Sequence, residues 1–311
     1  MSTRGGITAD GNHDESTLGG IEAGTGAPEG DEHVAALLAL ASALVYGTAD
    51  FCGGLATRRA AAQAVVAGSQ GAGLVLVLVL LPWFGGTVTW ADLGWAAAAG
   101  AAGNVGLVLF YRALAGGVMS VVAPVTAVCA AAVPVLAGVA LGDRVGLLAA
   151  AGIALALVAV VLVSAEEGVG ALRRTRPAGL GLPLLAGVGF GLFFVLLDQT
   201  SADAGLTPLV ASRGTAVLLL ALLALVRRHP LRLTRGALPL VLLGGALDVT
   251  ANALFLLATQ QPGQLAVVGV LASLYPVSTV VLAQVVLRER LVPAQLAGLG
   301  TAVLAVVLIT V

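Results

Sequence analysis

The chain has no lysine, and only 10% of its 311 residues are charged. Soluble domains average about 25% charged residues, so this composition excludes an ordinary water-soluble domain. Without lysine, the sequence cannot contain a phosphate-binding loop of the G-x-x-x-x-G-K-[ST] type, and ATP-driven transport would need another chain. The net charge is −1 and no large basic patch is present, so we expect no nucleic-acid partner.

Histidine and cysteine are also scarce. His13, His33 and His229 fall outside the apolar runs, and neither a His-rich metal set nor an HExxH motif occurs. Cys52 and Cys129 lie within apolar runs without metal-ligand spacing, which indicates packing residues. The sequence therefore predicts neither a metal nor a cofactor, and it argues against a membrane-embedded enzyme.

Aromatic residues make up 4% of the chain, and its three tryptophans, Trp83, Trp90 and Trp95, are close together in sequence. This pattern is typical of side chains at one membrane–water interface. It argues against an aromatic box for bulky cationic drugs.

What is abundant is apolar sequence: 59% of the residues are hydrophobic and the mean hydropathy is +1.04. The bilayer must be the solvent of this chain, and its length accommodates about ten spans of roughly 20 residues. The runs are continuous rather than alternating, which favours helices over a β-barrel. We place the spans at 34–54, 63–84, 92–114, 118–141, 146–164, 178–198, 206–226, 237–257, 265–287 and 292–311. Residues 1–33 are polar and acidic, and we expect them to be disordered.

The spans form two copies of one pattern, separated by 143 to 146 residues. The equivalent positions are Gly47 and Gly191, Ser69 and Ser212, Gly117 and Gly263, Asp143-Arg144 and Glu289-Arg290, and Gly152 and Gly298. Five crossings per copy leave the chain on the opposite side of the bilayer, so the second copy is inverted relative to the first. The predicted fold is an all-α membrane protein with repeats at 34–165 and 178–311, joined by a basic linker at 166–177. Inverted repeats around a central site are the physical basis of alternating access in carriers.

Arginine is distributed unevenly between the loops. Those after odd-numbered spans contain Arg58, Arg59, Arg173, Arg174, Arg176, Arg227, Arg228, Arg232, Arg235, Arg288 and Arg290, whereas only Arg4 and Arg144 lie on the other side. The positive-inside rule therefore places the odd loops in the cytoplasm and both termini outside.

Three prolines, Pro124, Pro134 and Pro276, are expected to interrupt the fourth and ninth helices, because each removes a backbone donor.

The fifth and tenth helices are rich in small residues, which allow helices to approach closely. We therefore expect these two helices to offer a homodimer face. Asp143-Arg144 and Glu289-Arg290 are expected to cap helix ends.

Several short motifs follow one another in the order of a known family. They are Tyr46-Gly47, the run 113–120, Phe190-Gly191, Arg213, Tyr275-Pro276 and Leu287-Arg288-Glu289-Arg290. On these motifs, residues 34–311 resemble the EamA-type members of the drug/metabolite transporter superfamily. The family's Leu-Gly-Glu-Arg signature has Asp143 for Glu in the first copy and Arg288 for Gly in the second, and Gln70 stands where an arginine is expected.

The resemblance implies a ten-helix fold from a duplicated five-helix unit. It also implies a substrate such as an amino acid or a related compound. Relatives are usually drawn with both termini inside, opposite to the orientation that the arginine count favours.

Two charged residues lie deep within predicted spans, where an ionisable group costs about 2.5–3.5 kcal/mol at the helix centre. Arg213 is a candidate to bind a substrate carboxylate or phosphate, and Asp248 to bind an amine or carry a coupling proton. Alternatively, the two neutralise one another as a structural pair. Asn252 lies one turn after Asp248, and Asn104 is at nearly the equivalent place in the third helix; both could contact a ligand or simply bridge helices.

Four further residues complete the candidate site. Tyr46, Tyr111 and Tyr275 are candidates for the wall of a substrate cavity, and Asp50 is a candidate for proton coupling. Asp50 is also close enough to Arg58 and Arg59 to lie at the membrane interface instead.

The leading hypothesis is a secondary transporter, an exporter or exchanger of a small polar metabolite, in the inner (plasma) membrane. The alternative is a non-transporting scaffold or lipid-handling partner protein. A scaffold should tolerate changes at Arg213 and Asp248, whereas a carrier should not.

Overall fold

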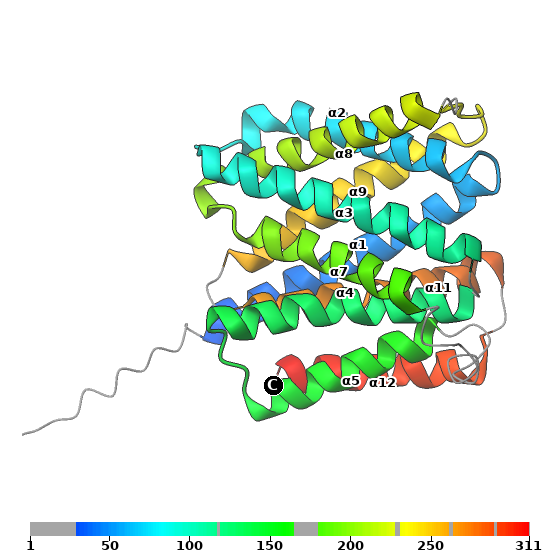
Figure 1. Cartoon of the computed structure of the whole chain (residues 1–311). Helices are drawn as coiled ribbons and strands as arrows, with labels where there is room; N and C mark the ends of the chain where they lie inside the picture. Colours follow the sequence, from blue (N-terminus) through cyan, green and yellow to red (C-terminus); the bar gives the residue numbers. More distant parts are fainter. Residues whose placement is uncertain are drawn as a thin grey trace, which may run out of the picture.

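The computed structural model describes residues 29–116, 119–164, 180–227, 231–260, 264–288 and 291–310. These segments are helical, apart from turns, short connections and one isolated bridge between Gly85 and Gly205 (Figure 1). Most of the N-terminal tail and the linker 166–177 lie outside the described residues, as do Glu289 and Arg290.

The helices correspond to the predicted spans within a few residues, except at the N-terminus. The first repeat comprises α1 (Glu29–Thr57), α2 (Ala62–Phe84), α3 (Trp90–Gly116), α4 (Met119–Leu141) and α5 (Leu147–Ser164). The second comprises α7 (Gly181–Asp198), the 3-10 turn η2 (Ala202–Ala204), α8 (Thr207–Arg227), α9 (Leu238–Thr259), α10 (Leu265–Ala272), α11 (Tyr275–Leu287) and α12 (Pro293–Thr310). The first helix begins five residues before the predicted start at residue 34.

Helix is the structure that these apolar runs must adopt in a bilayer, because it satisfies every backbone polar group within the segment. Eight helices in the described ranges are long and apolar enough to cross a membrane, and two more are shorter apolar helices. Large apolar side chains remain exposed around the bundle, among them Leu37, Leu136 and Leu147 at 66%, 70% and 88%. Lipid rather than water is the solvent for such a surface.

The ninth span is broken as predicted, whereas the fourth is not. Pro276 lies in the first turn of α11, where its missing N–H costs no helical hydrogen bond, and the chain turns at Ser273 and Leu274. The prediction for Pro124 and Pro134 was wrong, because α4 continues through both positions. Instead of breaking the helix, Pro134 packs against Gly269 of α10.

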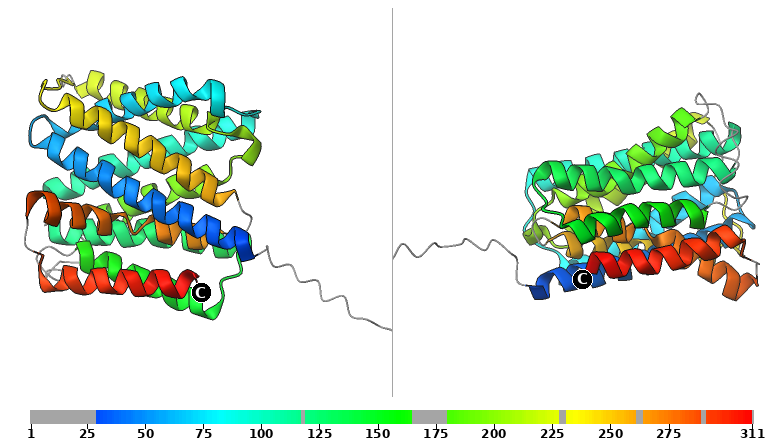
Figure 2. Two further views of the ribbon diagram at one scale, coloured as in Figure 1. Left: turned by 180° about the vertical axis from the view of Figure 1, so that it is seen from behind. Right: turned by 90° about the horizontal axis from the view of Figure 1, so that it is seen from below.

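The two repeats are interlocked rather than separate. Helix α1 packs against α9 and α11, and the equivalent helix α7 packs against α3 and α4. The contact of α2 with α9 is likewise matched by that of α8 with α3. The contacts α2–α8, α4–α10 and α5–α12 each join equivalent helices of the two copies, and α2 and α8 lie together at one edge of the bundle (Figures 1 and 2). This pattern is that of a pseudo-twofold axis between inverted repeats.

Glycines make the closest of these matched contacts. A side chain at Gly47 of α1 would collide with Ser278 and the Tyr275 carbonyl, and one at Gly191 of α7 would collide with Val133 and the Ala130 carbonyl. In the same way, Gly100 lies against the Ser212 backbone and Gly245 lies against the Ser69 backbone. Small residues allow such close backbone approach in membranes.

The small residues of α5 and α12 are used within the chain. Gly152 packs against Ala305 and Ile309 of α12, while Gly298 packs against Leu162 and Val163 of α5. These glycines therefore pack within the chain and are no evidence for a homodimer face. The homodimer stays a prediction.

Candidate functional site

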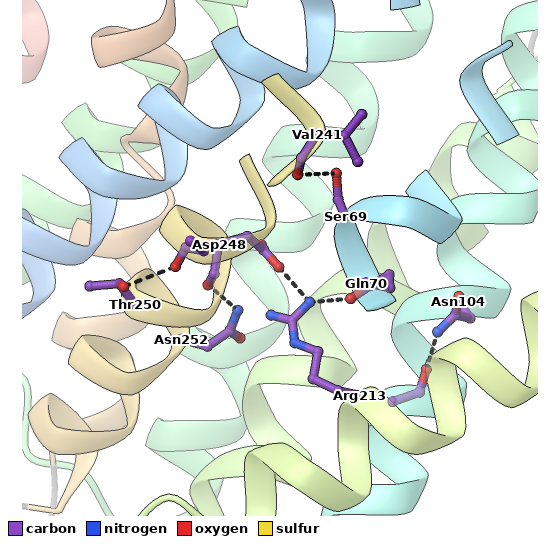
Figure 3. Close-up of polar contacts among 10 residues, drawn as sticks. Ser69, Gln70, Asn104, Arg213, Val241, Asp248, Thr250 and Asn252 are labelled. Atoms are coloured by element: carbon purple, nitrogen blue, oxygen red, sulfur yellow. Dashed lines mark hydrogen bonds and ion pairs between the residues drawn. The ribbon is translucent and has the colours of Figure 1, made fainter. Parts of the chain in front are cut away.

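The centre of the site is Arg213, in the first third of α8. Its side chain is 4% exposed and its Nη1 atom pairs with the Asp248 carboxylate of α9 and donates a hydrogen bond to Oε1 of Gln70 in α2 (Figure 3). The two charged residues that the sequence singled out thus form a buried pair. The pair joins α8 and α9 of the second repeat, and Gln70 connects it to α2 of the first.

Gln70 and Arg213 are equivalent positions of the two repeats, 143 residues apart. Because α2 and α8 pack on each other, these residues meet at the pseudo-twofold axis. A residue on such an axis contacts its own counterpart. An arginine at position 70 would therefore place two guanidinium groups in contact, which explains why the arginine expected in the second helix is absent.

The two asparagines beside this pair are each bonded to their own helix. Nδ2 of Asn252 donates to the Asp248 carbonyl at 2.7 Å, and Nδ2 of Asn104 donates to the Gly100 carbonyl at 2.8 Å. The oxygen Oδ1 of each amide is buried without a hydrogen-bond partner, as are Nε of Arg213 and the hydroxyl of Tyr46. Most buried polar groups in proteins are hydrogen-bonded, so each of these four atoms marks a position where a ligand or water could bind.

Aromatic rings lie next to the polar groups. The ring of Tyr46 is 6.0 Å from that of Phe194 and 6.3 Å from that of Tyr275, between ring centroids. Phe194 in turn lies 5.3 Å from Phe193 and 4.6 Å from Phe255. These five rings, which we call the aromatic cluster, come from α1, α7, α9 and α11. The chain has only 13 Phe, Tyr and Trp residues, and five of them lie in this cluster.

Asp50 follows Tyr46 by one turn of α1, so the two side chains share a face of the helix. Electrostatic interactions link Asp50 with Asp248 and with Tyr275. Its side chain is exposed. Both alternatives, a role in proton coupling and a place at the membrane interface, stay predictions.

The burial of α1 differs on the two sides of Tyr46. We call the face with Glu29 and Thr310 the terminal face, and the opposite face, with Arg58, Arg59, Arg232, Arg235 and Arg288, the basic face (Figure 2). From Tyr46 toward the terminal face, Ser42 and Ala39 on the same side of α1 are fully buried. Toward the basic face, Asp50 and Gly54 are exposed, and no heavy atom lies near a side chain built on Gly54. This side of α1 is therefore buried toward the terminal face and exposed toward the basic face.

A carboxylate helps to hold the terminal face closed. Asp92, at the start of α3, is 3% exposed and accepts hydrogen bonds from the N–H and hydroxyl of Thr89 and of Ser201, at 2.7 to 3.1 Å. It ties the loop after α2 to the loop after α7, and the Leu206 N–H donates to the Phe84 carbonyl beside it. The corresponding contact on the basic face uses a neutral acceptor, because Arg59 donates a hydrogen bond to the Gly236 carbonyl at 2.8 Å.

The structure brings Arg213, Asp248, Asn252, Tyr46, Tyr275 and Asp50 near one another, whereas the amide of Asn104 is bonded to its own helix α3. Tyr111 lies in α3, but its side chain is outside the described residues. Sequence reasoning missed three features: the contact of Gln70 with Arg213, the phenylalanines of the aromatic cluster, and the hydrogen bonds of Asp92. Only the duplication could have found Gln70, because it shows which positions are equivalent.

Of the two expected helix caps, one is described. The Asp143 carboxylate accepts a hydrogen bond from the Ala266 N–H at 2.8 Å, in the first turn of α10. This confirms that Asp143 caps a helix end, across the contact between the repeats.

Two grooves lie away from this cluster. One, of about 410 Å³, is lined by α2 and Leu242, and the other, of about 240 Å³, lies between Leu44 of α1 and Val281 of α11. Both are mainly apolar and open outward, as expected of grooves filled by lipid chains. Among the described residues, no group of three or more His, Cys, Asp or Glu side chains could hold a metal ion.

Fold and site together define an integral membrane protein made of two inverted helical repeats around a buried polar centre. The model of the EamA-like transporter family matches residues 33–165 and 177–311, so the chain belongs to this family. It is a multi-pass membrane transporter of the drug/metabolite transporter superfamily, which acts on a small-molecule substrate and is not an enzyme.

Comparison with solved structures agrees on the fold. A structure titled "Crystal structure of protein" has a TM-score of 0.68 at 15% identity, covering 88% of this chain and 95% of its own. At this identity the likeness shows the fold alone. No curated protein matches the sequence.

Proposed function

We propose that this protein is a secondary active exporter or exchanger of a small polar metabolite, such as an amino acid or a related compound, in the plasma membrane. The substrate binds at the cluster of Arg213, Asp248 and Asn252, with Tyr46, Tyr275 and Asn104 in its wall. The observation that carries the proposal is the buried Arg213–Asp248 pair, in which Nε of Arg213 and the neighbouring Oδ1 of Asn252 are buried without a hydrogen-bond partner.

These atoms suit a ligand with both polarities. Nε of Arg213 is a free donor for a carboxylate oxygen, and the amide oxygens of Asn252 and Asn104 are free acceptors. In a bilayer, polar groups of this kind are costly unless they serve a substrate or ion pathway. A bound zwitterion would satisfy groups that the empty site leaves without partners.

Alternating access supplies the transport cycle. We propose that the site opens toward the basic face, where Asp50 and Gly54 are exposed, and the positive-inside rule favours the cytoplasm for that face. Substrate would enter there, and separation of the Asp92 contacts would open the terminal face. We propose that Asp50 and Asp248 carry the coupling proton, because both are accessible carboxylates beside the pair, and Asp248 is 32% exposed.

The test is metabolite profiling of medium and cytosol from cells with the wild type, Arg213→Ala or Asp248→Asn at matched membrane levels. Asp203→Asn is the control, because it removes an exposed carboxylate outside the site. We expect one compound class to cross the membrane with the wild type and the control only. Counterflow of that compound in proteoliposomes then measures transport directly, and equal profiles for all variants at matched levels would contradict the assigned site.

A further inference from the structure

At the basic face, the loop before α2 is bonded to the loop before α9. Nη1 of Arg59 donates a hydrogen bond to the Gly236 carbonyl at 2.8 Å, and the Thr234 hydroxyl donates one to the Arg59 carbonyl at 3.0 Å. Arg235 directly precedes Gly236 and is exposed, as is Arg59. Two arginines, one from each repeat, therefore lie at a single contact between loops.

The described part of the chain does not neutralise these two cations. No described carboxylate forms an ion pair with Arg59 or Arg235, and the acceptor that Arg59 uses is an uncharged carbonyl. A guanidinium group has five N–H donors in a planar fork that matches a phosphate group. Basic pockets between membrane helices at such a face bind anionic lipid headgroups.

An apolar groove runs along the same pair of helices. It has a volume of about 410 Å³, opens outward to the lipid, and is lined by Gly71, Ala72, Val75, Leu76 and Val79 of α2 and by Leu242 of α9. No heavy atom lies within 4 Å of a side-chain carbon built on Gly71, so the missing side chain leaves part of the groove empty. Lipid tails are as apolar as leucine, so van der Waals contact holds an acyl chain there and the headgroup must supply the selectivity.

The spacing between the groove and the arginines fits one lipid molecule. Gly68 of α2 packs against Val241 of α9, which continues the helix contact from the loops toward the groove. Leu242 follows Gly236 by six residues, or roughly 9 Å along a helix axis. The headgroup region of one leaflet is about 5–7 Å deep. A phosphate bound beside Gly236 therefore has its acyl chain begin near the level of the groove.

The equivalent contact of α8 with α3 has similar apolar residues without the cations. Leu218 of α8 is equivalent to Val75, and the two side chains are 59% and 62% exposed. In place of the two arginines this contact has Ala202 and Trp90, and Asp203 follows Ala202 directly. The duplication thus made two such helix pairs, and only the α2–α9 pair suits an anionic headgroup.

We propose that an anionic phospholipid from the leaflet at the basic face binds along α2 and α9. Its phosphate contacts Arg59 and Arg235, and one acyl chain occupies the groove. The site is separate from the substrate cluster, and the inference does not depend on the proposed transport function. Because the two arginines belong to different repeats, the bound headgroup links the repeats at this face.

Three probes test the headgroup and the chain separately. Dioleoyl phosphatidylglycerol and dioleoyl phosphatidylcholine have the same acyl chains, and glycerol 3-phosphate has the anionic group without them. Each is added to the purified full-length chain in detergent, where a ligand that binds the native state raises the melting temperature. We expect phosphatidylglycerol to bind about tenfold more tightly than phosphatidylcholine, and glycerol 3-phosphate to leave the melting temperature unchanged. Native mass spectrometry counts the lipids that the chain retains.

Variants locate the headgroup. Arg59→Gln and Arg235→Gln should each lower the preference for phosphatidylglycerol about fivefold. Arg144→Gln is the control, because it removes an exposed arginine at the terminal face. The preference is a difference between two lipids on one variant, so a change in basal stability does not affect it. An unchanged preference in both variants, equal stabilisation by the two lipids, or stabilisation by glycerol 3-phosphate alone would overturn the inference.

A matched pair of substitutions locates the acyl chain. Val75→Trp fills the groove and should release the retained phosphatidylglycerol, whereas Leu218→Trp, at the equivalent position of the other repeat, should not. Equal retention in the two variants would contradict the assigned groove. A dimer in the mass spectrum that Val75→Trp abolishes would assign the groove to a second copy of the chain instead.

Discussion

Gly47 of the first repeat and Gly191 of the second have the same task, because each lets its helix touch the backbone of the ninth or fourth span. Gln70 and Arg213 are equally equivalent in position, but one is neutral and the other charged. The register that matches Gly100 with Gly245 also matches Gly103 with Asp248. The first repeat thus has a glycine where the second has the aspartate, and both members of the ion pair belong to the second repeat. The comparison teaches that packing follows the duplication, whereas the chemistry of the site depends on breaking it.

The physical reason lies in the axis itself. Contacts away from the axis occur twice and can use the same residues each time. A contact on the axis joins a residue to its counterpart, and two arginines there would repel each other. An arginine at this position can therefore be buried in one copy only if the equivalent residue of the other copy is neutral.

The largest expected effect comes from making the two copies alike. Arg213→Gln leaves the Asp248 carboxylate without its partner, and breaking a buried ion pair costs about 3–5 kcal/mol. We expect the lower end, since Asp248 is 32% exposed. Adding Gln70→Arg should restore a cation beside Asp248 and recover part of the loss. Melting temperatures of the single and double variants measure this, and a double variant no better than Arg213→Gln would contradict the axial contact.

A somewhat smaller effect is expected at the terminal face. Ala237 occupies the second repeat's equivalent of Asp92, so the carboxylate contact has no mirror image. Asp92→Asn removes the charge from four hydrogen bonds, and bonds to charged groups contribute about 1.5–3 kcal/mol. Hydrogen–deuterium exchange should rise in residues 85–92 and 199–206, with Asp203→Asn as the control. Unchanged exchange there would show that Asp92 does not hold this face closed.

The equivalent glycines should respond alike. Gly47→Ala and Gly191→Ala each place a methyl group against backbone atoms, and overpacking of this kind costs about 1–3 kcal/mol. Gly54→Ala in the same helix as Gly47 is the control, because no heavy atom lies within 4 Å of its added carbon. The melting temperature of the purified variants is the measurement. A large loss at only one of the two glycines would argue against matched packing.

The smallest effect concerns the two copies of the Leu-Gly-Glu-Arg signature, which follow α4 and α11. Gly142 has φ 109° and its counterpart Arg288 has φ 55°, a left-handed conformation that costs a non-glycine residue about 1 kcal/mol. Arg288→Gly should therefore stabilise the protein by about that amount, and Gly142→Ala should destabilise it. Thermal melts of both variants test the sign. A loss of stability in Arg288→Gly would mean that the arginine side chain contributes more than its backbone costs.

Much of the fold was predictable because lipid imposes simple rules. The spans, the duplication and the break before Pro276 followed from apolar length, repeated spacing and the missing N–H of proline. The same reasoning erred for Pro124 and Pro134, because a proline inside an apolar helix can be tolerated when neighbouring helices pack around it. Arg213 and Asp248 were recognised because a charge in a span needs a reason.

By itself, the sequence determined that this chain lies in a membrane, that it consists of two inverted copies, and that two buried charges distinguish the second copy. Tertiary structure alone decided that Gln70 meets Arg213 and that rings from four helices form one cluster. The reason is that hydrophobicity and spacing act along one helix and can be read from its residues. Contacts at the axis depend on how helices that are distant in sequence cross, and only the folded bundle fixes those crossings.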